Sequence, residues 1–105
     1  MSNHTVSTSF QTFMSEAPQH SAAWGEAVDQ LKKASALDAK TAALAYLSVL
    51  AVSGLESGLP FHVKQAKAHR AGRDEVISAI LIGLPAVGIK VLSSLPAALA
   101  AYDDK

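Results

Sequence analysis

The chain has 105 residues, half of them hydrophobic, and its nine basic residues balance its nine acidic ones. This length predicts one domain, and the balanced charge argues against a nucleic-acid-binding surface. The absence of cysteine excludes disulfides, thiolate metal sites and cysteine nucleophiles. No motif for a metal or another cofactor appears, so we expect neither.

The N-terminus, MSNHTVSTSF, has neither the basic nor the apolar region of a signal peptide. The most apolar run, residues 76–89, is interrupted by Gly83, Pro85 and Gly88. It falls short of the roughly 18 apolar residues that a spanning helix needs. We therefore expect a cytoplasmic protein with no membrane partner.

Residues 1–15 are rich in serine and threonine, and we expect them to be loosely ordered or only partly helical. Residues 16–105 are expected to form the single domain. Its first helix begins near Pro18, since proline suits a first helical turn. Trp24 and Leu31 follow at helical spacing and predict an amphipathic helix with one apolar stripe.

A second helix is predicted over about residues 39–53, with Asp38 as a good N-cap. Its interior, TAALAYLSVLAV, is apolar on nearly every face, and such a helix must be covered on every side. Residues 54–60 contain two glycines and a proline and predict a break. A third helix is predicted over about residues 61–70.

Acidic residues at Asp74 and Glu75 predict the start of a fourth helix, because they suit the positive end of the helix dipole. We expect it to end just before Pro85, which starts a fifth helix that runs to about Tyr102 with a kink at Pro96. No strand pattern competes. The sequence therefore predicts an all-α fold of about five to six helices.

The second and fourth predicted helices carry more apolar surface than a chain of this length can cover. Large exposed apolar patches are rare on soluble monomers, so we expect a homo-oligomer. The alternative is a tight monomer of five helices with a wholly buried central helix.

His62 follows the break, in the first turn of the third predicted helix. The positive end of that helix favours the neutral imidazole, which can act as a base or as a ligand. Glu56, beside Ser57, is the nearest candidate acid. The alternatives are a histidine that packs and hydrogen-bonds locally, and a polar surface loop around Glu56.

His69 shares a helix face with His62, but two turns separate them by about 10.5 Å along the axis, too far for one metal ion. A basic side chain recurs every three residues along the same segment: Lys64, Lys67, Arg70 and Arg73. This row could attract an anionic ligand, although such rows are more often solvated faces.

Four short motifs occur in a fixed order: LDAKT at the second helix, His62 after the break, Ala-Gly at positions 71–72, and RDEV at the fourth helix. With the apolar helices between them, they resemble the carboxymuconolactone decarboxylase family, which includes the alkyl hydroperoxidase D-like proteins. The resemblance spans Leu37 to about Ala98 without a gap. It implies a compact helical domain that forms a dimer, a trimer or a hexamer, and we favour an even number.

The redox branch of that family carries a glutamate, then a Cys-x-x-Cys pair, then a histidine four residues later. Counted back from His62, the cysteine positions fall on Gly58 and Leu55, and the glutamate position falls on Ala43. These three residues supply neither a thiolate nor a proton-transfer group. The resemblance therefore implies a member without thiol peroxidase activity.

Two hypotheses about function follow. The first is a degenerate, non-enzymatic oligomer that binds a small ligand such as a carboxylate. The second is a cysteine-free decarboxylase or isomerase-like enzyme for a small carboxylate or lactone, with His62 and Glu56 as catalytic residues and Lys64 or His69 assisting. An enclosed His62 with a second titratable group in reach would favour the enzyme.

Overall fold

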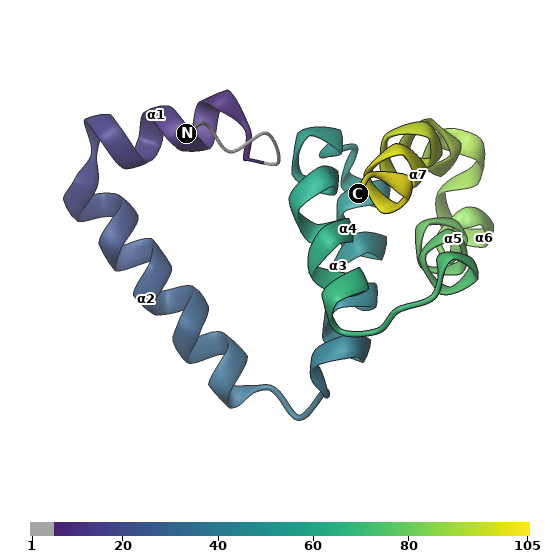
Figure 1. The fold of residues 1–105 in the computed structure, drawn as a ribbon, viewed down its shortest axis with the longest axis horizontal. Coiled ribbons are helices and arrows are strands. Elements are labelled where there is room, and N and C mark those ends of the chain that lie inside the picture. The colour runs from purple at the N-terminus through teal and green to yellow at the C-terminus, as the bar shows by residue number, and fades with distance from the viewer. Residues whose placement is uncertain (1–5) are drawn as a thin grey trace.

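The structure, a computed structural model, describes residues 6–105. These residues are largely helical, and none of them forms a strand, so the predicted all-α fold is confirmed (Figure 1). In chain order the elements are α1 (Thr8–Glu16), α2 (Pro18–Ala34), α3 (Ala39–Ser53), the 3₁₀ turn η1 (Glu56–Gly58), α4 (Leu59–Ala68), α5 (Arg73–Leu81), α6 (Leu84–Val87), the 3₁₀ segment η2 (Gly88–Ser94) and α7 (Leu95–Asp103).

Local sequence explains most of the helix starts. The carboxylate of Asp38 accepts a hydrogen bond from the Thr41 amide at 2.8 Å, so the predicted N-cap is present. Glu75 accepts one from the Gly72 amide, also at 2.8 Å, and so caps α5. α4, α6 and α7 each begin with a Leu-Pro pair, where the missing N–H of proline costs no helical hydrogen bond.

α1 occupies much of the N-terminal segment that we expected to be loose or only partly helical. The Ser7 hydroxyl caps it by accepting a hydrogen bond from the Phe10 amide at 3.2 Å. Residues 1–5 of that segment lie outside the described residues.

The expected fifth helix from Pro85 to Tyr102 is wrong, because the structure divides it into α6, η2 and α7. α6 ends at Gly88, which has a positive φ of 76° that favours glycine. Pro96 lies in the first turn of α7, so it begins a new helix instead of kinking an existing one.

The core lies within residues 39–103, which we call the body. α3 packs on α4 and α5, and α7 packs back onto α4 and α5. Gly83 lies so close to α3 that a Cβ at this position would be 2.6 Å from Cγ2 of Val52. The buried apolar cluster consists of Leu47, Leu50, Ala51, Leu59, Val63, Ala66, Ala71, Val76, Ala79, Ile80, Val91, Ala98 and Ala101.

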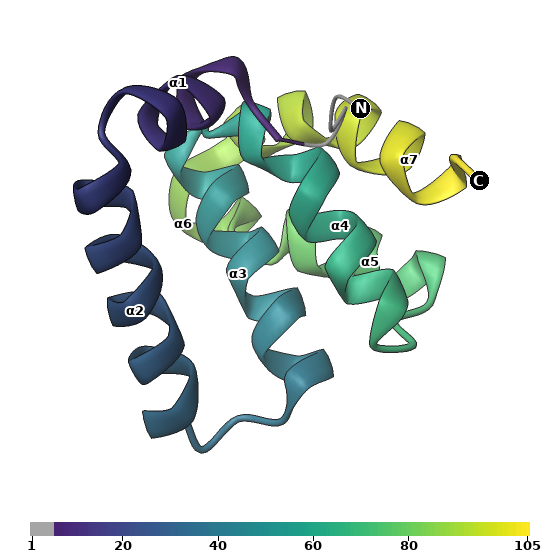
Figure 2. The same cartoon turned by 60° about the vertical axis from the view of Figure 1, so that its left-hand side comes forward.

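α1 and α2, which we call the arm (residues 8–34), contain no buried residue. They pack against each other and make only marginal contact with the body. Figures 1 and 2 show the arm as a bent pair of helices beside the body, joined to it by residues 35–38. Its large apolar side chains Phe10, Met14, Trp24 and Leu31 are exposed. The sequence placed the uncovered apolar surface on the second and fourth predicted helices, which correspond to α3 and α5. The structure shows that the arm carries exposed apolar side chains as well.

The stretch Arg73–Asp103 is long and apolar enough to cross a membrane by length and composition alone, with a mean hydropathy of 2.1 in its most apolar window. The argument from sequence that no helix is long enough to span a membrane therefore applies to residues 76–89 and not to the whole of Arg73–Asp103. The structure breaks this stretch at α6 and η2, and α7 returns to pack on α5. Only 22% of that window is buried, and Ile82 and Ile89 within the stretch are highly exposed.

Candidate functional site

His62 lies in the first turn of α4, half-buried between two aromatic rings. The centroid of its ring is 4.5 Å from that of Tyr46 on α3 and 5.1 Å from that of Phe61 beside it in the chain. Within residues 6–105 the imidazole makes no hydrogen bond and no ion pair. His62 therefore lies where the sequence predicted, at the start of its helix and close to α3. It packs on aromatic rings and is less buried than we expected.

Burial lowers the pKa of His62 below its ordinary value, and the positive charge of Lys32 on α2 lowers it further. The imidazole is therefore neutral at pH 7, as the sequence suggested. The cause of the neutral state differs from the one we expected. Desolvation and the charge of Lys32 lower the pKa, whereas the sequence argument relied on the helix dipole.

Glu56, the sequence-based partner of His62, does not join it. Glu56 is exposed in η1, and its carboxylate makes no hydrogen bond or salt bridge with any described residue. The structure thus places the His62 imidazole and the Tyr46 phenol at this face, without the carboxylate of Glu56.

The three family positions that have lost their chemistry differ in their surroundings. A Cβ at Gly58 would lie 3.9 Å from Cδ2 of His62 and 3.5 Å from a methyl group of Leu50, both ordinary contacts. Leu55 is exposed at the start of η1, and Ala43 packs against the core. A side chain at position 58 would therefore touch the imidazole.

The basic row holds α7 in place and leaves little charge for a ligand. Lys64 pairs with Asp104 at 2.8 Å, and Arg73 binds Asp103 through two hydrogen bonds of 2.9 and 3.0 Å. A third member, Lys67, donates to the Tyr102 carbonyl at 2.7 Å. Sequence reasoning missed these partners, although an acidic pair near the end of the chain was a visible signal.

The remaining sequence-based candidates are not brought to His62. His69 is exposed at the C-terminal end of α4. Within residues 6–105 no group of three or more histidine and acidic side chains has the geometry of a metal site.

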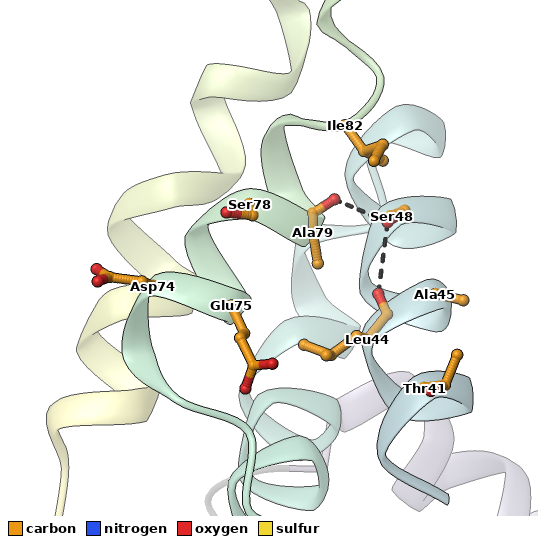
Figure 3. A pocket seen from close by; sticks show the side chains of 9 residues that line it. All are labelled: Thr41, Leu44, Ala45, Ser48, Asp74, Glu75, Ser78, Ala79 and Ile82. Carbon is orange, nitrogen blue, oxygen red and sulfur yellow. Dashed lines mark hydrogen bonds between the residues drawn. The ribbon is translucent and has the colours of Figure 1, made fainter. Parts of the chain in front are cut away.

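An open groove of about 590 Å³ runs between α3 and α5, away from His62 (Figure 3). Its lining is mostly apolar, and Ser48 closes its floor by donating a 2.7 Å hydrogen bond to the Ala79 carbonyl. The residues that line it are Thr41, Leu44, Ala45, Ser48, Asp74, Glu75, Ser78, Ala79 and Ile82. Sequence reasoning missed this groove, because its two walls are about thirty residues apart in the chain.

The model of the carboxymuconolactone decarboxylase family matches residues 18–101, from the first turn of α2 into α7. No curated protein and no solved structure matches the chain. The matched residues exceed half of the chain and include every position compared above, His62 among them. The chain therefore belongs to the carboxymuconolactone decarboxylase family, as a member without cysteine.

Proposed function

We propose that this chain is a homo-oligomeric, cytoplasmic family member that has lost the thiol chemistry and binds a small molecule at the His62 face without converting it. The observation that carries the proposal is a neutral, half-buried imidazole that packs on two aromatic rings. Its titratable neighbour in the described chain is the Tyr46 phenol, and no carboxylate lies beside the imidazole to complete an acid–base pair with it.

The chemistry of this face suggests the class of ligand. Tyr46 and Phe61 are both partly exposed, so each leaves ring surface for a flat apolar group. A neutral imidazole offers one N–H donor and one acceptor nitrogen, and the donor suits a carboxylate or carbonyl oxygen. A small unsaturated or cyclic molecule with one carboxylate meets both requirements.

A second candidate is a cysteine-free decarboxylase or isomerase-like enzyme for a small carboxylate or lactone. One observation favours it: the imidazole of His62 is neutral, as a general base must be before it accepts a proton. The Tyr46 phenol or a group from another subunit would then have to serve as the acid.

Titration with small unsaturated carboxylates and lactones, followed by NMR of the histidine and tyrosine ring protons, tests the proposal. We expect one compound class to shift the His62 and Tyr46 signals while its own spectrum stays unchanged. His62→Gln should weaken binding about tenfold, which is the loss of one good hydrogen bond. The matched control His69→Gln, at an exposed histidine, should not. Conversion of the compound would favour the enzyme, and the absence of any shift would contradict both candidates.

The unmodified chain is expected to show no thiol-dependent peroxidase activity, since its only sulfur atoms are the thioethers of Met1 and Met14. The triple variant Ala43→Glu, Leu55→Cys, Gly58→Cys returns the missing groups to their family positions. We expect a disulfide to form, seen by thiol titration before and after reduction. Thiols that stay free under mild oxidation would show that η1 has lost the redox geometry, and peroxide turnover by the unmodified chain would contradict the proposal.

A further inference from the structure

We propose that α2 of one chain lies antiparallel to α5 in the α3–α5 groove of a second copy, and that the second copy returns the same contact. The occupant of the groove is thus the arm of this protein. The inference goes beyond the proposed ligand site and does not depend on it, because the groove lining includes neither His62 nor its aromatic neighbours.

The groove has the chemistry of a helix-binding surface. Its lining is mostly apolar, the Ser48 hydroxyl on its floor is already bonded to the Ala79 carbonyl, and the groove is open rather than enclosed. Ile82, at one end, leaves 69% of its surface exposed, and Asp74 and Glu75 line the other. Lys40 already pairs with the Glu75 carboxylate at 2.8 Å, so Asp74 supplies the unpaired negative charge of that end. A groove with an apolar floor and an acidic end suits an amphipathic helix that carries a basic residue at the matching end.

α2 is such a helix. Trp24 and Leu31 on its apolar stripe are 57% and 68% exposed, and no residue of α2 is buried. Lys32 and Lys33 occupy its last turn. α1, the other arm helix, has no basic residue in its last turn and therefore lacks the matching charge.

The spacing of the two helices matches in the antiparallel sense. Trp24 and Lys32 are eight residues apart, and so are Asp74 and Ile82, which is about 12 Å along either helix. When Trp24 is level with Ile82, Lys32 is therefore level with Asp74, and each pair turns by about 80° around its own helix, which a crossed packing of the two helices accommodates. Neither Lys32 nor Asp74 makes a salt bridge within the described part of its own chain, so both charges are available. Antiparallel helix dipoles also attract each other at these ends.

The arm does not fill the groove of its own chain. Figures 1 and 2 show α2 on the opposite side of α3 and α4 from α5, whereas the groove lies between α3 and α5. No arm residue lines the groove. An exchange between two copies covers both unpaired surfaces at once and gives a closed pair with two-fold symmetry.

Disulfide trapping tests the contact cleanly, because the chain has no cysteine of its own. Trp24→Cys and Ile82→Cys are made in separate chains, mixed and mildly oxidised, so that a mixed disulfide must join two molecules. We expect this dimer to form about tenfold faster than with the control acceptor Gln65→Cys, on the exposed side of α4, because docking raises the effective thiol concentration. Equal rates would overturn the proposal.

Charge exchange gives a second test with no thiol. Lys32→Glu should weaken self-association about fivefold by light scattering, and adding Asp74→Lys to the same chain should restore it. Failure of the double variant to recover would contradict the predicted register.

A chain carrying both Trp24→Cys and Ile82→Cys that closes on itself at high dilution, while the mixture forms no dimer, would place the arm in its own groove. Monomers that bind phosphatidylcholine vesicles through Ile82 would instead assign the groove to lipid, and both results would overturn the proposal.

Discussion

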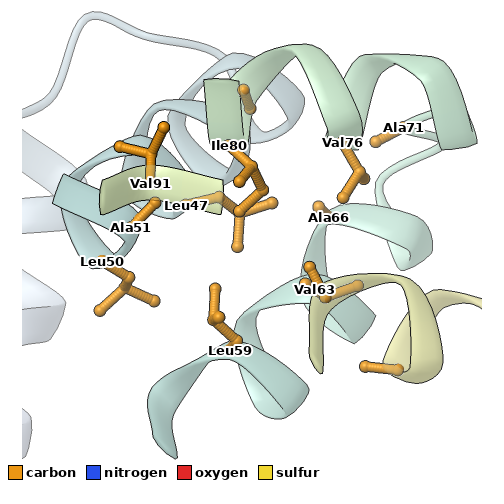
Figure 4. Close-up of a cluster of buried hydrophobic side chains, with 13 residues drawn as sticks. Leu47, Leu50, Ala51, Leu59, Val63, Ala66, Ala71, Val76, Ile80 and Val91 are labelled. Carbon is orange, nitrogen blue, oxygen red and sulfur yellow. The ribbon is translucent and has the colours of Figure 1, made fainter. Parts of the chain in front are cut away.

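The arm and the body differ in what their helices bury. α2, with 17 residues, is the longest described helix and buries none of them, whereas the ten-residue α4 buries Leu59, Val63 and Ala66 completely. In Figure 4 these side chains lie with Leu47 and Ile80 in one cluster where several helices meet. In this chain, then, helix formation depends on local signals, and burial depends on the neighbours that a helix finds.

Leu47→Ala should give the largest loss of stability and show the contrast most directly. Leu47 is fully buried, so removing its side chain leaves a cavity and should cost about 2–5 kcal/mol. The matched control Leu31→Ala, on the arm, should change the stability of the dilute monomer by less than about 0.5 kcal/mol. Urea unfolding of both variants measures the difference. Equal losses would mean that the arm is part of the core.

Gly83→Ala tests how tightly the body is packed. The added Cβ would meet Val52 at 2.6 Å, so α3 or the turn after α5 must move, at a cost of about 1–3 kcal/mol. Gly25→Ala, on the arm, is the control, because nothing lies within 4 Å of its Cβ position. Since alanine is the better helix former, this change should stabilise the arm by up to about 1 kcal/mol. In thermal unfolding, Gly83→Ala should lower the unfolding temperature and Gly25→Ala should raise it.

Arg70→Gly should stabilise the body by a smaller amount. Arg70 has a positive φ of 72°, the only such residue other than glycine in the described chain, at the point where α4 ends. A side chain is strained there, and glycine should relieve up to about 1 kcal/mol of that strain. Arg73→Gly would lose the pairing with Asp103 and serves as a control that should destabilise. The unfolding temperature should rise for Arg70→Gly and fall for Arg73→Gly, and a rise in neither variant would contradict the prediction.

The smallest expected effect is the dependence of stability on pH through His62. Its pKa is lowered in the folded state, so protonation favours the unfolded chain. The contribution is complete above the ordinary histidine pKa of about 6.5 and declines as pH falls below it. Between about pH 7.5 and 5.5 the wild type should therefore lose more stability than His62→Gln. An equal loss in both would show that His62 titrates as an exposed histidine.

Local features of the fold could be predicted from sequence, and contacts between distant segments could not. The Asp38 cap and the break after residue 53 follow from signals within a few residues. Gly54 ends α3 with a positive φ of 71°, in the way that a helix-terminating glycine does. The division at Gly88 was missed, because a glycine within an apolar run is compatible with either a helix or a turn.

The candidate site divides in the same way. Spacing located His62 at the start of a helix, but it did not identify Tyr46, sixteen residues earlier, as the ring against which it packs. The neutral imidazole was predicted, and the role of Lys32 was not, because that charge comes from a separate helix. The α3–α5 groove lay beyond sequence reasoning altogether, since its shape exists only when both helices are in place.

The close approach of position 58 to His62 makes this chain useful as a chemical reference. In redox members of the family a thiol, a second thiol, a glutamate and a histidine act together, so their separate effects on thiol acidity are hard to resolve. Here Gly58→Cys alone would place one thiol beside one imidazole in a background free of other thiols. The pH dependence of its alkylation would measure how far a histidine by itself lowers a thiol pKa. Adding Ala43→Glu and then Leu55→Cys would rebuild the family chemistry one group at a time.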